Sequence, residues 1–144
     1  RLGDWAGEHR YGIATAESLT SGNLAANLGR ASGSSDWFCG GVVAYRKSVK
    51  YNLLQVPDGP VVSPARARAM ARSAAELLGA DIAIAVTGEA GPKTQEDVPP
   101  GTVWFGIYDR GELRAEHRRF DGEPDDVLAE TISVALDLLL ALAD

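Results

Sequence analysis

The chain has 144 residues and a hydrophobic content of 45%, which suits one globular domain that buries a core. Its net charge of −6 argues against a basic surface for nucleic acid, and its single cysteine excludes an internal disulfide. The two histidines form no cluster with the spacing of a zinc site. No apolar run reaches the ~18 residues of a membrane span, and the first residues lack the regions of a signal peptide. We therefore expect one cytoplasmic domain over residues 1–144 that binds neither nucleic acid nor membrane.

Strand-like and helical segments alternate along the first half of the chain. Residues 11–16 form an apolar run that predicts a buried strand, and residues 23–28 continue with the helical spacing of apolar residues. Residues 40–45 predict a second strand, and residues 46–54 predict a short helix that ends in a turn rich in Pro and Gly. The apolar neighbours of Cys39 favour a buried thiol over a reactive one.

The second half of the chain continues the alternation. Ser63 and Pro64 are a typical N-cap and first residue of a helix, which we expect to run to Gly79. Residues 81–87 are apolar almost throughout, as in a central strand covered on both faces, and a long loop follows over residues 88–100. The remaining segments predict an antiparallel hairpin and a final helix, at residues 101–109, 112–120 and 124–143. This order of elements predicts an α/β layered fold.

Ser18 lies between the first predicted strand and the first predicted helix. A serine at this position can act as a nucleophile, because a helix N-terminus presents unpaired N–H groups that bind a phosphate or a developing oxyanion. Serine is also a preferred N-cap, and the local sequence alone favours that structural role. The choice between the two roles depends on residues elsewhere in the chain.

A lysine is a better candidate base for Ser18 than either histidine, because neither histidine lies in a context suited to a Ser-His-Asp triad. Tyr45 falls at the end of the second predicted strand, and Lys50 falls in the helix that follows. Burial and a nearby cation favour a neutral lysine that can take the serine proton, while a tyrosine hydroxyl can relay the proton or orient the substrate. The alternative is a core tyrosine and a surface lysine, neither with a catalytic role.

A glycine-rich segment follows the central predicted strand, with the sequence Thr87-Gly88-Glu89-Ala90-Gly91-Pro92. Ligands of open α/β sheets gather outside the carboxyl ends of the strands, so this segment can share a crevice with Ser18. Its glycines allow backbone amides to approach a phosphate or a ring, but they are equally compatible with a turn that binds no ligand.

Together these segments resemble the CinA C-terminal domain family, whose characterised members are nicotinamide mononucleotide deamidases. The resemblance covers nearly the whole chain and is carried by blocks in the same order: Ala16-Glu17-Ser18-Leu19-Thr20-Ser21-Gly22, Gly40-Gly41-Val42-Val43-Ala44-Tyr45 with Lys50, Val62-Ser63 with Met70-Ala71, and Thr87-Gly88-Glu89-Ala90-Gly91-Pro92 leading to Pro100-Gly101-Thr102-Val103. It implies a three-layer α/β/α fold with a mixed sheet of about five strands. It also implies a homodimer.

The resemblance implies a serine hydrolase that converts the nicotinamide carboxamide to the acid and releases ammonia, without a metal or organic cofactor. Its nucleophile, tyrosine and lysine correspond to Ser18, Tyr45 and Lys50. Residues of the same blocks are expected to bind the pyridine nucleotide or a related small amide: Glu17, Thr20, Ser21, Gly22, Thr87, Gly88, Ala90 and Gly91.

The chain departs from the family pattern where substrate would be held. Leu19 and Ser21 stand where the family usually has Cys and Gly, and residues 93–99 replace a glycine pair and Lys-Pro. The block that begins at Phe120 lacks the family's arginine. Replacement charge can come from three cations that are otherwise typical of a solvated surface, namely Arg46, Lys47 or Lys93. Three functions therefore stay open: an amidohydrolase of nicotinamide mononucleotide, an amidohydrolase of another small amide, and a ligand-binding or assembly module without activity.

Overall fold

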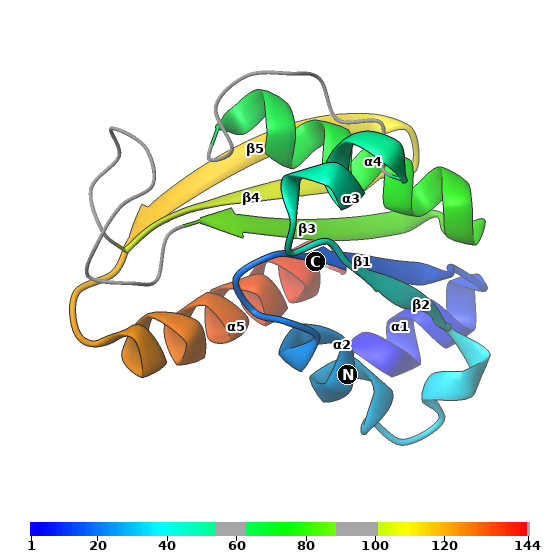
Figure 1. The fold of residues 1–144 in the computed structure, drawn as a ribbon. Helices are drawn as coiled ribbons and strands as arrows, with labels where there is room; N and C mark the ends of the chain where they lie inside the picture. The colour runs from blue at the N-terminus through cyan, green and yellow to red at the C-terminus, as the bar shows by residue number, and fades with distance from the viewer. Residues whose placement is uncertain (54–62, 89–100, 144) are drawn as a thin grey trace.

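The computed structural model describes residues 1–53, 63–88 and 101–143, along which helices and strands alternate (Figure 1). The elements in chain order are α1 (Leu2–His9), β1 (Ile13–Glu17), α2 (Asn23–Gly29), the 3₁₀ helix η1 (Ser34–Asp36), β2 (Phe38–Val43), α3 (Lys47–Asn52), α4 (Pro64–Leu78), β3 (Ile82–Gly88), β4 (Thr102–Asp109), β5 (Glu112–Arg119) and α5 (Pro124–Ala141). Every strand expected from the sequence is present, and so are the expected helices.

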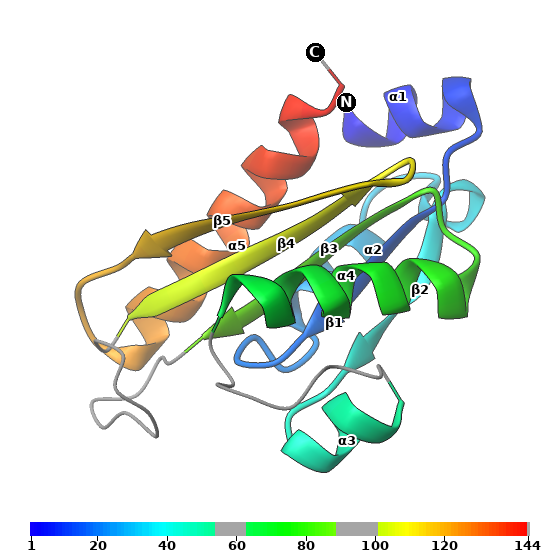
Figure 2. The same ribbon diagram turned by 90° about the horizontal axis from the view of Figure 1, so that it is seen from above.

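The five strands form one mixed sheet in the order β2-β1-β3-β4-β5. β1 pairs in parallel with both β2 and β3, whereas β4 pairs antiparallel with β3 and with β5. Helices α3 and α4 cover one face of the sheet, and α1, α2 and α5 cover the other (Figures 1 and 2). This arrangement confirms the α/β fold with a five-stranded mixed sheet between helices.

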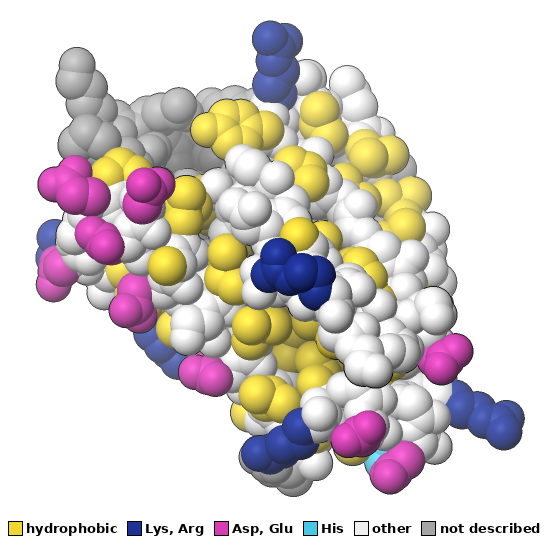
Figure 3. Space-filling model, turned by 90° about the horizontal axis from the view of Figure 1, so that it is seen from below, with side chains coloured by type: hydrophobic (Ala, Val, Ile, Leu, Met, Phe, Trp, Pro, Cys, Tyr) yellow, Lys and Arg dark blue, Asp and Glu magenta, His cyan; other side chains and the backbone are white. Residues whose placement is uncertain are grey.

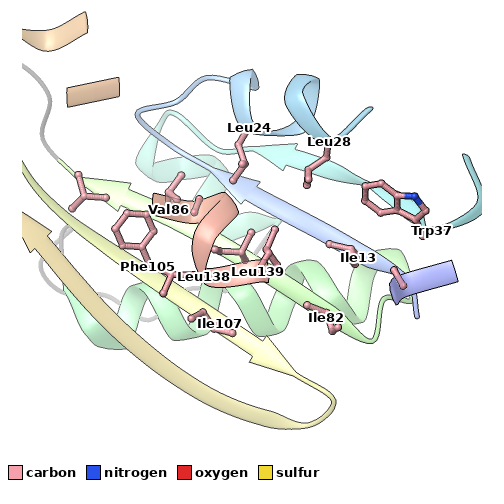
Figure 4. Packing of buried hydrophobic residues seen from close by; sticks show 14 of the residues in the cluster. Ile13, Leu24, Leu28, Trp37, Ile82, Val86, Phe105, Ile107, Leu138 and Leu139 are labelled. Atoms are coloured by element: carbon pink, nitrogen blue, oxygen red, sulfur yellow. The ribbon is translucent and has the colours of Figure 1, made fainter. Parts of the chain in front are cut away.

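The two faces of the sheet carry side chains of different size. The face toward α4 is lined by alanines of β1 and β3, which pack against Met70 and the alanines of α4. These small side chains allow the α4 backbone to lie close to the sheet. The face toward α2 and α5 instead packs large side chains into a core (Figure 4), which includes Leu24, Val86, Phe105 and Leu139.

Helix α4 lies very close to the sheet at Gly106 of β4. A Cβ atom at Gly106 would collide with the main-chain carbonyl oxygen of Ala67. Only glycine allows the helix backbone to lie directly on the strand at this point. The first turn of α4 is therefore held at a fixed height above the sheet.

The local sequence sets both ends of α4. Ser63 Oγ accepts a hydrogen bond from the Arg66 N–H at 3.2 Å, and Pro64 stands in the first turn. The helix ends at Gly79, which adopts the left-handed conformation with φ of 65°. Residues 79–81 connect α4 directly to β3, so the helix and the strand run antiparallel. The first turn of α4 thus lies at the edge of the sheet where β1 and β3 end (Figure 2).

Two short helices, α1 and η1, are absent from the sequence-based prediction. Gly3 and Gly7 lower the helix propensity of α1, which is stabilised by tertiary contacts instead. The Trp5 ring packs edge-on against Tyr11 with 5.3 Å between centroids, and the Arg110 guanidinium lies 5.0 Å from the Tyr11 centroid. These contacts anchor α1 to the turn between β4 and β5, and no local pattern could reveal them.

The prediction that Cys39 is buried is wrong. Cys39 lies on β2, an edge strand, and its side chain is exposed. Desolvation by the atoms around it, and to a smaller degree the charge of Asp81, raise the pKa of the Cys39 thiol. A raised pKa disfavours the thiolate, which is the nucleophilic form.

Figure 3 shows the outer face made by α1, α2 and α5. Hydrophobic side chains gather across its middle, where Lys or Arg side chains also lie, and acidic side chains are found at both sides. Ile132 and Val134 of α5 are partly buried against the core beneath. No helix within residues 1–53, 63–88 and 101–143 is long and apolar enough to cross a membrane.

Candidate active site

Ser18 follows directly after β1, at the carboxyl edge of the sheet. Its N–H donates a hydrogen bond to Val86 O at 3.2 Å, which extends the pairing of β1 with β3 beyond the strand. The chain then turns sharply: the Ser21 N–H donates to Ser18 O at 3.2 Å, and Ser21 and Gly22 have φ of 51° and 97°. Ser18 is only 8% exposed. The serine is therefore held at the junction of the sheet and the turn that leads into α2.

Lys50 reaches Ser18 from the last turn of α3. The lysine is 1% exposed, and its Nζ donates a hydrogen bond to Ser18 Oγ at 3.1 Å. The alternative of a surface lysine is therefore wrong. The distance between the two atoms is within the range over which a base takes a proton from a nucleophile.

The contact between Lys50 Nζ and Ser18 Oγ decides what this pair can do chemically. In its neutral form the Lys50 amine can accept the hydroxyl proton of Ser18, because the two atoms are only 3.1 Å apart. The arrangement suits nucleophilic attack by the serine with the lysine as base.

Glu17, the last residue of β1, is fully buried with three protein donors around its carboxylate. Its Oε1 accepts hydrogen bonds from Thr20 Oγ1 at 2.6 Å and from the Leu24 N–H at 2.8 Å. Its Oε2 accepts from the Ala25 N–H at 2.9 Å. The N-cap residue of α2 is Gly22, which has no side chain, so Glu17 caps this helix from the neighbouring strand.

The capping by Glu17 changes which amides are open to a ligand. It occupies two N–H groups of the α2 N-terminus that a bound anion would use. Within the described part of the chain, the N–H groups that make no hydrogen bond near Ser18 belong to the turn, at Leu19, Thr20 and Gly22. These turn amides are the candidate donors to an oxyanion formed at Ser18.

Thr87 and Gly88 lie at the end of β3, on the same edge of the sheet as Ser18. Thr87 is fully buried. A Cβ atom at Gly88 would lie 2.6 Å from the carbonyl oxygen of Thr102, so glycine is required here by the packing of β3 against β4. The other two predicted residues of this segment, Ala90 and Gly91, lie outside the described residues.

Tyr45 is placed differently from the other two proposed catalytic residues. It follows β2 and is 70% exposed, so the alternative of a core tyrosine is wrong. Within the described residues, no hydrogen bond joins Tyr45 to Ser18 or to Lys50. The structure thus brings the serine and the lysine together but does not record the tyrosine in contact with either.

Arg66 is a buried cation that the sequence-based prediction does not include. It lies in the first turn of α4, at the edge of the sheet that holds Ser18, and it is 2% exposed. Arginine is rarely buried without partners, and Arg66 does interact with other groups of the protein. The sequence could have indicated that Arg66 is buried, because it shares a helix face with Ala69 and Met70, three and four residues later, which are buried as well.

The cations considered from the sequence as replacements for the missing arginine are less well placed. Arg46 is exposed. The side chain of Lys47 and the whole of Lys93 lie outside the described part of the structure.

Comparison with known proteins gives a consistent result. The model of the CinA C-terminal domain family matches residues 1–143. The nicotinamide-nucleotide amidohydrolase PncC of Pseudomonas putida is 40% identical over 99% of this chain and 92% of its own length. A CinA-like protein of Citrifermentans bemidjiense is 41% identical over 88% of this chain, but the match spans only 32% of that longer protein.

Solved structures agree in fold as well as in sequence. A competence or damage-inducible protein from Enterobacter asburiae superposes with a TM-score of 0.96 at 29% identity, covering 99% of this chain and 94% of that one. A CinA superfamily protein from Klebsiella pneumoniae superposes with a TM-score of 0.91 at 35% identity, covering 96% and 90% of the two chains. The chain belongs to the CinA C-terminal domain family.

Proposed function

We propose that the protein hydrolyses the carboxamide of nicotinamide mononucleotide to nicotinate mononucleotide and ammonia. One observation carries this function: a buried lysine amine lies 3.1 Å from the hydroxyl of a buried serine at the edge of the sheet. The similarity to a relative named nicotinamide-nucleotide amidohydrolase, over nearly the whole length of both chains, supports the substrate. The contact between Ser18 and Lys50 supports the type of reaction.

In the first half of the proposed reaction, Ser18 Oγ attacks the carboxamide carbon as its proton passes to Lys50 Nζ. The tetrahedral intermediate carries a negative oxygen, which the N–H groups of the turn after Ser18 can stabilise. The intermediate then collapses with cleavage of the C–N bond. Lys50 returns its proton to the departing nitrogen, so ammonia leaves as a neutral molecule and an acyl-enzyme remains.

In the second half, a water molecule attacks the acyl carbon while Lys50 takes one of its protons. Collapse of the second intermediate releases the carboxylic acid and returns the proton to Ser18 Oγ. Water is the only co-reactant that these steps consume. We assign Tyr45 to the outer wall of the site, where its hydroxyl orients the amide or relays the proton.

The remaining predicted residues divide into two groups in this proposal. The turn residues Thr20 and Gly22 present backbone amides to the reacting carbonyl together with Leu19. The Ser21 N–H already donates to Ser18 O and instead shapes the turn. Thr87 and Gly88 border the site from the end of β3.

Arg66 provides the positive charge for the substrate phosphate in the proposed complex. It lies in the first turn of α4, at the same edge as the serine, and a guanidinium can bind two phosphate oxygens at once. This assignment accounts for how a chain without the family's arginine after Phe120 can retain an anionic substrate.

Ammonia release from purified protein tests the function directly. The panel contains nicotinamide mononucleotide, the riboside that lacks its phosphate, free nicotinamide and an unrelated small amide. The proposal expects release from the mononucleotide, loss of release in Ser18→Ala, and weaker turnover of the riboside. Preferential release from the unrelated amide would identify an amidohydrolase with another substrate. Binding of the mononucleotide without release would identify a ligand-binding module.

A further inference from the structure

We infer that Glu17 is a positioning residue, which fixes the turn that carries Ser18 without touching the substrate. The inference rests on the proposed function, because positioning matters only if Ser18 reacts. It gives Glu17 a different role from the substrate contact that its place in the sequence suggested.

The first argument is the burial of the Glu17 charge. A carboxylate with no exposed surface is costly unless donors surround it, and here three donors do so at 2.6–2.9 Å. Two of the donors are N–H groups at the positive end of α2, where a negative charge is favourable. These protein groups already compensate the carboxylate, which leaves it no need of a substrate donor.

The second argument is the position of those donors along the chain. The Thr20 hydroxyl belongs to the middle of the turn, and the Leu24 and Ala25 N–H groups belong to the helix at its far end. The carboxylate therefore joins the start of the turn to its middle and its end. The N–H groups of Leu19, Thr20 and Gly22, proposed as oxyanion donors, lie within the segment that it closes.

The third argument is the attachment of Glu17 itself. Its carbonyl oxygen accepts the Ala44 N–H at 2.8 Å, and the N–H of the next residue, Ser18, donates to Val86 O at 3.2 Å. The end of β1 is thus bonded to segments on both sides. The side-chain hydrogen bonds of Glu17 hold the turn in place relative to the end of β1. Catalytic groups require this type of support, since a displacement of about 1 Å can cost ~10²-fold in rate.

The test compares variants that remove one donor or one acceptor with a matched control. Glu17→Gln keeps the shape but places an NH₂ group against an N–H donor. Thr20→Val removes only the hydroxyl donor, and Thr20→Ser restores it. Thr131→Val is the control, because Thr131 is equally buried and donates to Val127 O at 2.7 Å within α5, away from the turn.

Two activities are measured at a temperature where circular dichroism shows every variant folded. The first is steady-state ammonia release from nicotinamide mononucleotide. The second is covalent labelling of Ser18 by a fluorophosphonate, detected by mass spectrometry, which does not depend on the substrate. We expect kcat and the labelling rate to fall roughly 10- to 100-fold in Glu17→Gln, with KM little changed. Thr20→Val should lose less, and Thr20→Ser should recover most of that loss.

Each other result has a definite meaning. Wild-type rates in Glu17→Gln and Thr20→Val would overturn the inference, and so would an equal loss in Thr131→Val, which would indicate general destabilisation. A raised KM with unchanged kcat and labelling would make Glu17 a substrate ligand instead. If wild-type protein is labelled at Ser18 but releases no ammonia, the proposed function fails while the labelling rates still decide the role of Glu17. A wild-type Ser18 that resists labelling overturns both.

Discussion

Lys50 Nζ and Ser18 Oγ are 3.1 Å apart although the two residues are separated by 32 positions in the chain. The contact depends on β2 returning beside β1 in parallel and on α3 folding back over the ends of these strands. Both residues are buried, so water competes little for either polar group. The pair is therefore the part of the site that mutation can test most directly.

Replacement of Lys50 by Met should abolish turnover while the fold survives. Methionine fills a similar volume without a titratable group, so Ser18 loses its base but the cavity stays filled. We expect kcat for ammonia release to fall by about 10²–10⁴-fold, the usual contribution of general-base catalysis. Lys50→Arg is the matched test of a long basic side chain: a guanidinium stays protonated and cannot act as the base, so its activity should be equally low. Substantial activity in either variant would exclude Lys50 as the base.

Ser18→Ala should remove the acyl-enzyme. Rapid quenching of wild-type protein with substrate, followed by intact-mass spectrometry, should show a mass increase that maps to Ser18, and the alanine variant should show none. Substrate affinity, measured by calorimetry, should change much less than turnover, because Ser18 contributes mainly in the transition state. An adduct on any other residue would assign the nucleophile elsewhere.

Tyr45→Phe tests whether the Tyr45 hydroxyl takes part in the reaction or has no catalytic role. The change removes only the hydroxyl, and at a side chain that is 70% exposed it should leave stability within about 0.5 kcal/mol of wild type. If the hydroxyl assists the reaction, kcat should fall with little change in thermal stability. Unchanged kcat and KM would show that Tyr45 is not a catalytic residue and would leave Ser18 and Lys50 as the proposed catalytic pair.

The elements that the sequence predicts well are those specified by local chemistry. Ser63, Pro64 and Gly79 mark the ends of α4 because capping depends on a few adjacent residues. The parallel strands β1 and β3 are mostly apolar because both of their faces are covered. Helix α1 escapes prediction because its stabilising partners, such as Arg110, are distant in the chain.

The candidate site shows the same division between local and distant determinants. The residues of the Ser18 block are recognisable as a motif, but the partners of Glu17 are seven and eight residues further on, across a turn with two left-handed residues. The pairing of Ser18 with Lys50 depends on the topology of the sheet, so spacing alone does not determine it. The residues alone offer Lys50 as a candidate base beside the alternative of a surface lysine, and the resemblance to a family favours the pair. Arg66 escapes prediction because the resemblance does not include it.

Arg66→Gln should affect substrates according to their charge. Loss of a charged hydrogen-bonding partner costs about 1.5–3 kcal/mol, which corresponds to roughly a 10- to 150-fold rise in KM for nicotinamide mononucleotide. The riboside lacks the phosphate, so its kcat/KM should be nearly unchanged. Arg68→Gln, a half-buried position on the same helix, is the control and should leave both substrates unaffected. An equal loss for mononucleotide and riboside would show that Arg66 stabilises the fold instead of binding phosphate.

Gly106→Ala should weaken both the fold and the site, because the added methyl group would meet the carbonyl of Ala67 and force α4 away from the sheet. Overpacking of this kind costs about 1–3 kcal/mol, and the collision here is with a backbone that cannot rotate away, so the upper end is expected. Urea denaturation gives the free energy of unfolding. Gly7→Ala in α1 is the matched control, since a Cβ there meets no atom within 4 Å and should stabilise the helix by roughly 0.5–1 kcal/mol.

Displacement of α4 also moves its first turn, so KM for the mononucleotide should rise in Gly106→Ala even where the protein is fully folded. Wild-type stability in Gly106→Ala would show that the helix shifts at little cost and that its height above the sheet does not determine the position of Arg66.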